Sequence, residues 1–413
     1  MHKVCVIGSG GREHALSYRL SQSKIVDEVY CMPGNVGMKK HAKLVNIDIN
    51  DFDAVVKFCK DTSISLVIVG PEVPLMKGIV DVLIANDIKV FGPTKKAAQL
   101  ESSKAFAKDF MKRNKIQSAN YELFDDYEKA LEYLETQEYP LVIKASGLAQ
   151  GKGVLICEDI SQAKTALYEI MNDKIFGSSG DLVLIEEFMD GEEFSLFALC
   201  HNEQYVILPA VQDHKRAYDG DLGPNTGGMG VYMPVPFVND AIIETAVKDI
   251  VQPTLKYMIE EDNPFTGVLF VGIMMHHGVP KVIEYNTRFG DPETEILMLA
   301  MESDLYSVIV DLLDDKKPSV KFSNDAFVGV VLAAKGYPND PITHKAIPNL
   351  DDIASNIFHM GTTLDDDILV NSGGRALIFC NKGDTISDAR DKAYKDLARL
   401  DSEDFFFRKD IGH

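Results

Sequence analysis

The sequence predicts an α/β protein of several domains whose N-terminal part is a parallel, doubly wound sheet. The chain has 413 residues, which corresponds to about two to four domains with separate cores. Short apolar runs alternate with amphipathic segments over residues 1–100, as in a sheet covered by helices. A further apolar strand, at 141–143, leads directly into a glycine-rich turn. These observations indicate a substrate- or nucleotide-binding protein with its loops at the sheet edges.

The N-terminal strands are expected at residues 4–7, 29–32, 66–69 and 89–91. Helices are expected between them, because apolar residues recur there at helical spacing around Leu16, Val55 and Val80. Parallel sheets bind ligands beyond the carboxyl ends of their strands. The candidate binding loops are therefore 8–14, 33–37 and 70–74.

The first of these loops, GSGGREH at 8–14, partly matches a dinucleotide-binding turn. Glu13 stands in place of the third glycine, and Cys31 and Met32 end the second strand where an acid should bind a ribose. NAD or FAD binding is therefore disfavoured. A phosphate or sugar phosphate at this helix N-terminus fits better, since free N–H groups and the helix dipole favour an anion. A tight turn would explain the glycines alone.

The glycine-rich turn in PLVIKASGLAQGKGV, 140–154, is the strongest single signal for a nucleotide. Lys144 ends the strand, and glycines free the following backbone for close approach to a polyanion. The turn is not a Walker A loop, because Gly153 stands where Ser or Thr would hold magnesium. The run therefore predicts phosphate binding in another architecture, with a glycine-rich hairpin bearing solvated lysines as the alternative.

The next segments are expected to form a long helix from Thr94 to about Lys115, a helix over 125–137, a strand at 154–157 and a helix around 163–171. Residues 181–199 are expected to form two strands with a break at 190–191. A strand that emerges there into an extended linker can present backbone groups to an adenine, and Glu193 can accept hydrogen bonds from a ribose. For Glu192, a solvated acidic turn is the preferred interpretation.

Residues 212–234 lack apolar periodicity and are rich in Gly, Asp, Asn and Pro. Unstructured loops longer than ~12–15 residues inside compact domains are usually functional or disordered. This segment contains Asp213, His214, Lys215 and Arg216 in succession. We therefore expect a long ordered loop that closes over a ligand.

The run KVIEYNTRFGDPETE, 281–295, predicts a cation site. Alternation places Glu284 and Asn286 on the same face of one strand, so that both side-chain oxygens can meet one hard cation such as Mg²⁺. Arg288 follows on the same side and can contact an anionic substrate, and 291–294 should begin the next helix. A surface strand of alternating polar residues is the alternative.

Composition excludes several classes of protein. A formal net charge of -21 argues against broad nucleic-acid binding, which relies on Lys and Arg at phosphates. No apolar stretch reaches the ~20 residues that span a membrane, and the N-terminus does not resemble an export signal. The 6 cysteines are widely spaced and form neither a zinc pattern nor a disulfide framework. We expect a cytoplasmic protein with reduced thiols.

The motifs together resemble the ATP-grasp ligases, and within them the phosphoribosylamine–glycine ligase family. The resemblance covers essentially the whole chain and rests on GSGGREH, PGNVG, GPEVPL, KASGLAQGKGV, DHKRAYDGDLGPNTGGMG and IEYNTRFGDPE, in the order of that family. It implies a pre-ATP-grasp substrate domain at 1–100, a central α+β ATP-grasp fold at 101–324 with a lid subdomain at about 120–187, and a small α+β domain at 325–413.

The resemblance also implies roles for individual residues. ATP would contact Lys104, Lys144, Gly147, Gly151, Lys152, the hinge residues Glu186 and Glu187, and Glu193. Mg²⁺ or Mn²⁺ would bind Glu284 and Asn286. The catalytic group would comprise Asp213, His214, Lys215 and Arg288. The substrates would contact Gly8, Gly10, Gly11, Arg12, Glu13, Asn35, Pro71, Glu72, Asp291 and Pro292.

The implied reaction joins glycine to 5-phosphoribosylamine in de novo purine biosynthesis, through glycyl phosphate, and releases ADP and phosphate. The implied protein is a monomer or weak homodimer that contacts the preceding amidotransferase transiently.

The strand at 267–275 carries no acid, which argues against a second metal. The C-terminal part should contain strands at 327–334, 368–370 and 375–379 and a helix at 386–400. It shows no catalytic cluster; Gly373-Gly374-Arg375 either closes over substrate or forms a hairpin turn.

Three other functions compete with this interpretation. Another ATP-grasp carboxylate–amine ligase, or a biotin-type carboxylase, would keep Lys144, Glu284 and Asn286 but lack DGDLGPNTGGMG. An NAD-dependent oxidoreductase would need the missing glycine and ribose acid. A non-catalytic nucleotide sensor would not need both metal ligands and the lysines.

Overall fold

The computed structural model describes residues 2–147, 153–400 and 402–413. Its N-terminal part is a five-stranded parallel sheet in the order β3-β2-β1-β4-β5. The strands are β1 (His2–Gly8), β2 (Val26–Pro33), β3 (Lys43–Leu44), β4 (Leu66–Val69) and β5 (Val90–Phe91). The helices are α1 (Gly11–Ser21), η1 (Val36–Lys40), α2 (Phe52–Thr62), α3 (Glu72–Lys77) and α4 (Ile79–Ala85). The predicted parallel α/β class is confirmed.

The central part is built on the antiparallel sheet β11-β10-β16-β17. Its strands are β10 (Glu192–His201), β11 (Gln204–Ile207), β16 (Thr266–His276) and β17 (Val279–Asn286). One face shares a core with α5 (Gln99–Ser102), α6 (Lys104–Arg113), α9 (Asp240–Ala246), η4 (Val247–Val251) and α10 (Gln252–Glu260). The two metal-ligand candidates thus lie on an edge strand of this sheet, at the carboxyl end of β17.

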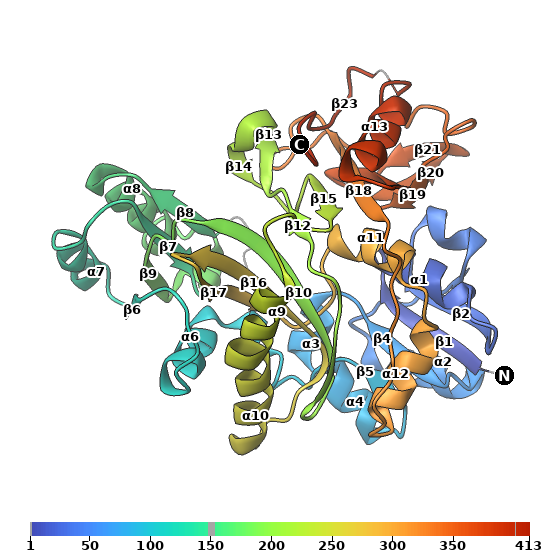
Figure 1. The fold of residues 1–413 in the computed structure, drawn as a ribbon, viewed down its shortest axis with the longest axis horizontal. Coiled ribbons are helices and arrows are strands. Elements are labelled where there is room, and N and C mark those ends of the chain that lie inside the picture. Colours follow the sequence, from blue (N-terminus) through green and yellow to red (C-terminus); the bar gives the residue numbers. More distant parts are fainter. Residues whose placement is uncertain (1, 148–152, 401) are drawn as a thin grey trace.

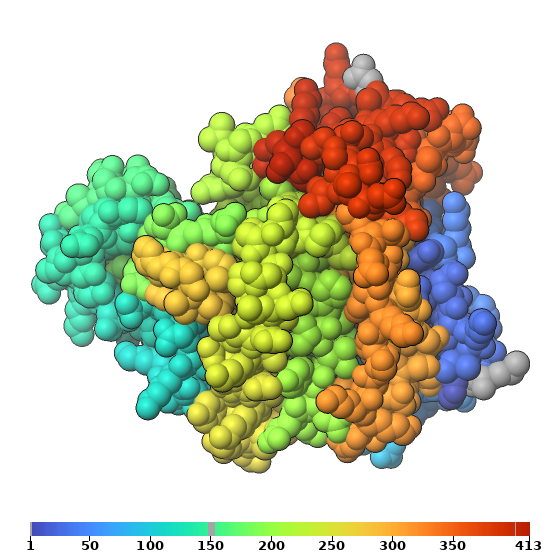
Figure 2. Space-filling model, viewed as in Figure 1, coloured from blue at the N-terminus to red at the C-terminus, as the bar shows by residue number. Residues whose placement is uncertain are grey.

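A separate four-stranded sheet, β6-β9-β7-β8, forms a lobe at the side of the central sheet (Figures 1 and 2). It contains β6 (Tyr121–Phe124), β7 (Leu141–Ala145), β8 (Val154–Cys157) and β9 (Val183–Glu187). Its other elements are α7 (Tyr127–Leu134), α8 (Ile160–Met171) and η2 (Gly177–Gly180). The lobe has its own apolar core, in which α7 and α8 pack on the sheet.

The C-terminal part is an antiparallel sheet that includes two strands from the middle of the chain. The order is β12-β15-β18-β22-β19, with β23 paired to β18. The strands are β12 (Gln212–Asp213), β15 (Gly230–Met233), β18 (Ala326–Ala334), β19 (Asn356–His359), β22 (Arg375–Gly383) and β23 (Phe405–Phe406). The other elements are α11 (Glu293–Ala300), α12 (Leu305–Leu313), α13 (Ile386–Leu397) and the hairpin of β20 (Thr362–Asp365) and β21 (Ile368–Asn371).

Two predictions about elements were wrong. The helix expected from Thr94 to Lys115 breaks at Ser103, whose extended backbone and hydroxyl cap the start of α6; the hydroxyl accepts a hydrogen bond from Phe106 N at 3.2 Å. The segment 212–234 is not an element-free loop. It contains β12, β13 (Arg216–Tyr218), η3 (Asp219–Asp221), β14 (Leu222–Asn225) and β15. Backbone pairing with β18 orders it, and such pairing requires no apolar periodicity.

Two further observations concern the chemical environment. The cysteines are buried and free, and burial raises the pKa of the Cys5 and Cys200 thiols. Among the helices of the described residues, none has the length and apolarity needed to cross a membrane.

Candidate active site

A cavity of about 760 Å³ lies where the lid lobe, the central sheet and the N- and C-terminal parts meet. Most of the site residues predicted from the sequence line it. They are Arg12, Glu72, Lys104, Lys144, Glu186, Glu187, Glu193, Asp213, His214, Lys215, Glu284, Asn286, Arg288 and Asp291. One cleft therefore collects the predicted nucleotide, metal and catalytic residues.

One side of this cleft carries two buried lysines around one carboxylate. Lys144 Nζ on β7 lies 2.8 Å from Glu186 Oε2, and Lys108 Nζ on α6 lies 3.3 Å from the same oxygen. Burial lowers the pKa of Lys108 to about 8, although Glu186 opposes this effect. Glu186 Oε1 is buried and has no hydrogen-bond partner among the described residues. Glu186, which lines the cleft, can therefore accept a further hydrogen bond at Oε1.

Lys108 was missed by the sequence analysis. Helical spacing could have indicated Lys108 as a second cleft lysine, because residues four apart in a helix, such as Lys104 and Lys108, lie on the same face. Lys104 Nζ donates to Gly147 O at 3.3 Å, which connects α6 to the lid turn. A Cβ at Gly147 would lie 2.6 Å from Ser179 Oγ, so glycine permits this close approach. The predicted contacts of Gly151 and Lys152 lie outside the described residues.

The predicted adenine hinge is the exit of β9. Glu187 N donates to Asn120 O at 3.0 Å, and the Glu187 carboxylate accepts from Asn120 Nδ2 at 2.7 Å. These contacts occupy the backbone N–H and one carboxylate oxygen of Glu187, and its contact with an adenine stays a prediction. The next residues, Phe188 and Met189, line the cleft and were not singled out from the sequence. An apolar and aromatic pair after a strand is the signal that could have indicated them.

Glu193 on β10 forms an ion pair with Lys215, just beyond β12. The pair joins the central sheet to the 212–234 segment. Burial lowers the pKa of Lys215, but Glu193 and Glu284 outweigh burial and hold this pKa above its ordinary value. Lys215 therefore remains charged inside the cleft.

The two metal-ligand candidates project from the end of β17. Burial raises the pKa of Glu284, but Lys215, Lys104 and other nearby cations outweigh it and keep this pKa below its ordinary value. An ionised carboxylate beside the Asn286 amide oxygen is an oxygen pair that suits Mg²⁺. On β16, Gly272 stands opposite Glu284, so the neighbouring strand adds no carboxylate there. The described residues hold no cluster of three or more His, Cys, Asp or Glu with metal-binding geometry.

Arg288 lies next to this pair. Its Nη2 donates to Asn286 Oδ1 at 3.2 Å and lies 3.0 Å from Glu101 Oε1, while its Nε lies 3.6 Å from Glu72 Oε2. Glu101 also accepts from Thr287 N at 2.8 Å. The sequence analysis missed Glu101, since the contact joins segments 186 residues apart.

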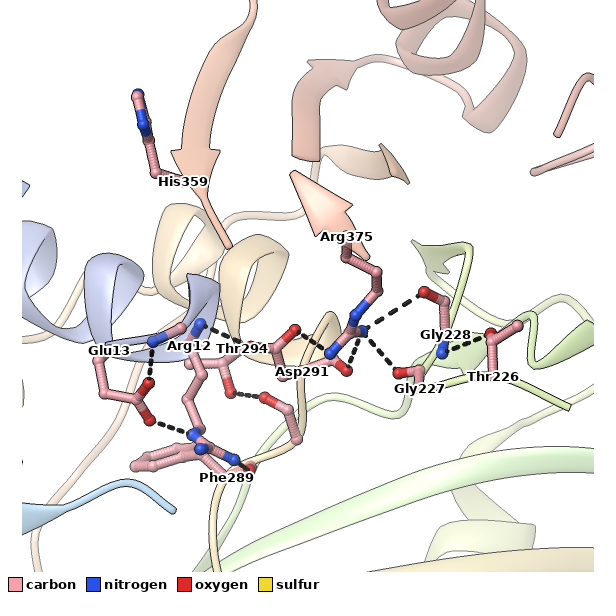
Figure 3. A network of polar contacts seen from close by, with 12 residues as sticks. Arg12, Glu13, Thr226, Gly227, Gly228, Phe289, Asp291, Thr294, His359 and Arg375 are labelled. Carbon is pink, nitrogen blue, oxygen red and sulfur yellow. Dashed lines mark hydrogen bonds and ion pairs between the residues drawn. The ribbon is translucent and has the colours of Figure 1, made fainter. Parts of the chain in front are cut away.

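The opposite wall of the cleft is a polar network around Asp291 (Figure 3). Arg12 N donates to Asp291 Oδ2 at 3.1 Å, and Arg375 Nη2 lies 2.9 Å from Asp291 Oδ1. The Arg12 guanidinium pairs with Glu13 and donates to Phe289 O at 3.0 Å. Asp291 thus joins the N-terminal part to the C-terminal part beside the cleft.

The predicted phosphate-binding turn at the start of α1 is differently arranged. Gly10 N donates to Glu13 Oε2 at 2.6 Å, and Arg12 N is engaged by Asp291, so carboxylates already occupy these two amides. A Cβ at Gly11 would collide with the Glu295 carboxylate, which shows how closely α1 packs on α11. The predicted residues outside the cleft lining are Gly8, Gly10, Gly11, Glu13, Asn35, Pro71, Gly147 and Pro292. Their direct contact with substrate stays a prediction.

Asp213 and His214 begin the segment that crosses the cleft. Burial, and then Glu293, raises the pKa of Asp213 well above its ordinary value. Burial, and then Arg408, lowers the pKa of His214. Glu293 and Arg375 also line the cleft and were not among the predicted site residues. The Gly373-Gly374-Arg375 run did indicate Arg375, but left its role open.

The lid sheet, the central sheet and the lysines between them define the class of protein, the ATP-grasp proteins. Comparison with known families makes this specific. Family models of phosphoribosylglycinamide synthetase match residues 2–101 (N domain), 102–294 (ATP-grasp (A) domain) and 327–413 (C domain). The chain belongs to the phosphoribosylglycinamide synthetase family.

Individual relatives agree over the full length. The chain is 44% identical over 411 residues to the phosphoribosylamine–glycine ligase of Halalkalibacterium halodurans, covering 99% of this chain and 96% of the relative. It is 45% identical over 414 residues to the enzyme of that name from Listeria innocua, covering 99% of each.

Solved structures show the same relation. The phosphoribosylamine–glycine ligase of Thermotoga maritima superposes with a TM-score of 0.87 at 34% identity and covers 99% of both chains. The biotin carboxylase domain of a Hydrogenobacter thermophilus 2-oxoglutarate carboxylase has a TM-score of 0.71 at 15% identity, covering 98% of this chain and 91% of that one. This second likeness concerns the fold alone.

Proposed function

We propose that this protein is an ATP-dependent carbon–nitrogen ligase that joins glycine to 5-phosphoribosylamine. The products are glycinamide ribonucleotide, ADP and phosphate. The observation that carries this proposal is that one cleft unites buried lysines for a polyphosphate, an oxygen pair for a metal and polar groups from both terminal parts. Full-length relatives that bear the name of this activity support the choice of substrates.

The chemistry follows from the low reactivity of a carboxylate toward an amine. The terminal phosphoryl group of ATP passes to a glycine oxygen, which breaks its bond to ADP and gives glycyl phosphate. The amine then attacks the carbonyl carbon, and phosphate leaves. Lys104, Lys108 and Lys144 line the cleft, and their charges could offset that of the phosphates there.

Glu284 and Asn286 would hold Mg²⁺, which offsets phosphate charge when bound. We propose Mg²⁺ or Mn²⁺ at this pair, because a carboxylate and an amide offer hard oxygen ligands that suit both ions, and water with phosphate oxygens can complete the shell. We propose one ion at this pair, since β16 carries no acid over Thr266–His276.

Arg288 is the group that we assign to the glycine carboxylate. It lies beside Asn286, so a carboxylate bound there is adjacent to the proposed metal. Asp213 is assigned to the attacking amine, because burial and the charge of Glu293 raise the pKa of its carboxyl and make the ionised form a stronger proton acceptor. Lys215 and His214 would position phosphoribosylamine, the acceptor of the glycyl group.

We place this reaction in de novo purine biosynthesis in the cytoplasm. The acceptor is the labile amine that an amidotransferase supplies, and a transient contact with that enzyme would shorten its exposure to water. We propose a monomer or weak homodimer. Sedimentation of the protein alone and with the amidotransferase tests both statements.

The decisive assay measures ADP release with ATP, glycine and freshly prepared phosphoribosylamine, each omitted in turn. We expect ADP only when all three are present, together with glycinamide ribonucleotide in equal amount. ADP formation with another carboxylate or with bicarbonate in place of glycine would instead indicate a different ligase or a carboxylase. ADP formation that needs neither substrate would refute the ligase function.

A further inference from the structure

Two arginines of the C-terminal part, the half-buried Arg375 and the buried Arg408, hold the 213–228 segment at two places. Arg375 begins β22, and Arg408 follows β23. The held segment belongs to the middle of the chain and supplies Asp213, His214 and Lys215 to the cleft. The C-terminal part, which has no predicted catalytic cluster, therefore contacts the part of the cleft that we assign to phosphoribosylamine.

Arg375 fixes the glycine end of the segment (Figure 3). Its Nη1 donates to Gly227 O at 2.6 Å and to Asp291 O at 2.7 Å, while its Nη2 pairs with the Asp291 carboxylate. One planar guanidinium thus joins two segments that line the cleft. A lysine could not make these contacts simultaneously, because its donors radiate from one atom.

Arg408 fixes the hairpin end. Its side chain is 1% exposed, and it donates to both carboxylate oxygens of Asp410 at 2.7 Å each. The remaining Nη1 donates to Asp221 Oδ1 at 2.7 Å and to Arg216 O at 3.1 Å. Asp410 Oδ2 also accepts from Gly220 N at 2.8 Å, and Lys409 N donates to Asp219 Oδ1 at 2.7 Å. Arg408, Lys409 and Asp410 therefore hydrogen-bond to residues 216–221 of the β13–β14 hairpin. We call these contacts the grip.

Apart from these polar contacts, the described residues hold the hairpin through the buried Ala217 and a ring contact between Tyr218 and Phe406. Tyr218 is 51% exposed and Leu222 is 65% exposed, so the tip does not bury an apolar core. An isolated two-stranded hairpin is marginally stable in water. Its position over the cleft depends on the polar contacts with Arg408 and the tail.

We propose that Arg375 and Arg408 are positioning residues through which the C-terminal part holds the 213–228 segment over the acceptor side of the cleft. This inference rests on the proposed ligase function. The lysines assigned to the ATP phosphates lie outside the held segment, because Lys104 and Lys108 are on α6 and Lys144 is on β7. Loss of the grip therefore impairs use of the acceptor while nucleotide binding persists.

Two variants test these contacts of Arg408. Asp221→Gly removes the carboxylate that Arg408 holds, and glycine tolerates the backbone there, where φ is 54°. Arg408→Lys keeps the charge but cannot bridge Asp410 and Asp221. The matched control is Arg390→Lys, since Arg390 donates to Gly412 O at 3.4 Å and pairs with Asp391, away from the hairpin.

We expect each test variant to lower kcat/KM for phosphoribosylamine by about tenfold to a hundredfold, as for loss of a charge-assisted contact. The Kd of a non-hydrolysable ATP analogue should remain that of the wild type. Amide hydrogen exchange should accelerate in 216–225 and not in the lid. The control should match the wild type in all three measurements.

Wild-type kcat/KM in both variants would overturn the inference. A parallel loss of ATP-analogue binding and kcat/KM would also overturn it, because it would reveal a general structural role. If Arg408→Lys does not fold, Asp221→Gly decides alone. A wild-type protein without glycine-dependent and phosphoribosylamine-dependent ADP release would refute the proposed function itself, which separates the two failures.

Discussion

The buried carboxylate of Glu186 forms ion pairs with both Lys108 and Lys144. Two cations around one anion leave a net positive charge in a place with little water, which is costly unless another anion arrives. A polyphosphate supplies that anion. The same reasoning applies to Glu284, which nearby cations keep ionised so that a metal can bind it.

Lys144→Ala should raise the KM for ATP and reduce kcat/KM by about tenfold to a hundredfold, because one charge-assisted phosphate contact is lost. The fold should persist, since Lys108 still neutralises Glu186. Steady-state kinetics at varied ATP tests this. Lys164→Ala is the control, because Lys164 pairs with Glu135 on the lid surface. Unchanged ATP kinetics in Lys144→Ala would remove this lysine from the site.

Glu284→Gln should lower activity and weaken metal binding, because it removes the charge of the proposed ligand and preserves its shape. Raised Mg²⁺ should restore part of the activity. The measurements are activity and Mn²⁺ binding, the latter by paramagnetic relaxation. The exposed Glu203→Gln serves as control. Wild-type metal dependence in Glu284→Gln would place the ion elsewhere.

At the scale of single elements, α6 shows how a short helix builds the phosphate side of the cleft. Ser103 ends α5 and caps α6, so that Lys104 occupies the first position of the new helix. Lys108 follows one turn later and reaches Glu186. The break therefore sets the direction from which both lysines enter the cleft.

Ser103→Ala should lower the free energy of unfolding by about 1 kcal/mol, the usual cost of a lost N-cap. Urea denaturation followed by far-UV circular dichroism measures this change. Ser102→Ala, at the last position of α5, is the control, since no capping role is assigned to it. Equal stability of the two variants would mean that the Ser103 hydroxyl does not cap α6.

Local patterns predicted much of this architecture and part of the site. The strands of the N-terminal sheet and the Glu284–Asn286 pair follow from periodicity alone, because strand geometry fixes which residues share a face. The break at Ser103 was missed because the flanking apolar pattern continues through it. Arg375 could not be assigned a role, since its contact with Asp291 joins residues 84 apart. Long-range contacts of this kind leave no local pattern.

At the scale of the whole molecule, the N- and C-terminal parts meet through the buried His14 and the half-buried His359. His359 N donates to His14 Nδ1 at 2.9 Å, and Asn35 Nδ2 donates to His359 O at 2.8 Å. Burial, and then Lys40, lowers the pKa of His359 to about 4. Burial, and then His359, lowers the pKa of His14. The interface therefore requires neutral imidazoles.

Acidification should destabilise the protein through these histidines. Between pH 6.5 and about 4, the unfolded chain binds a proton that folded His359 does not, so stability is present above pH 6.5 and falls as pH decreases toward 4. His359→Asn should flatten this part of the stability profile, measured by denaturant unfolding at each pH. The control is His277→Asn, in an exposed turn. Identical slopes in wild type and His359→Asn would contradict the expectation.

The central claim is that glycine is activated as an acyl phosphate in this cleft. The direct measurement uses glycine whose carboxylate carries heavy oxygen, with ATP and phosphoribosylamine, and mass analysis of the released phosphate. We predict one labelled oxygen in each phosphate, because the glycine oxygen that accepts the phosphoryl group leaves with it. Product formation with unlabelled phosphate would contradict the claim.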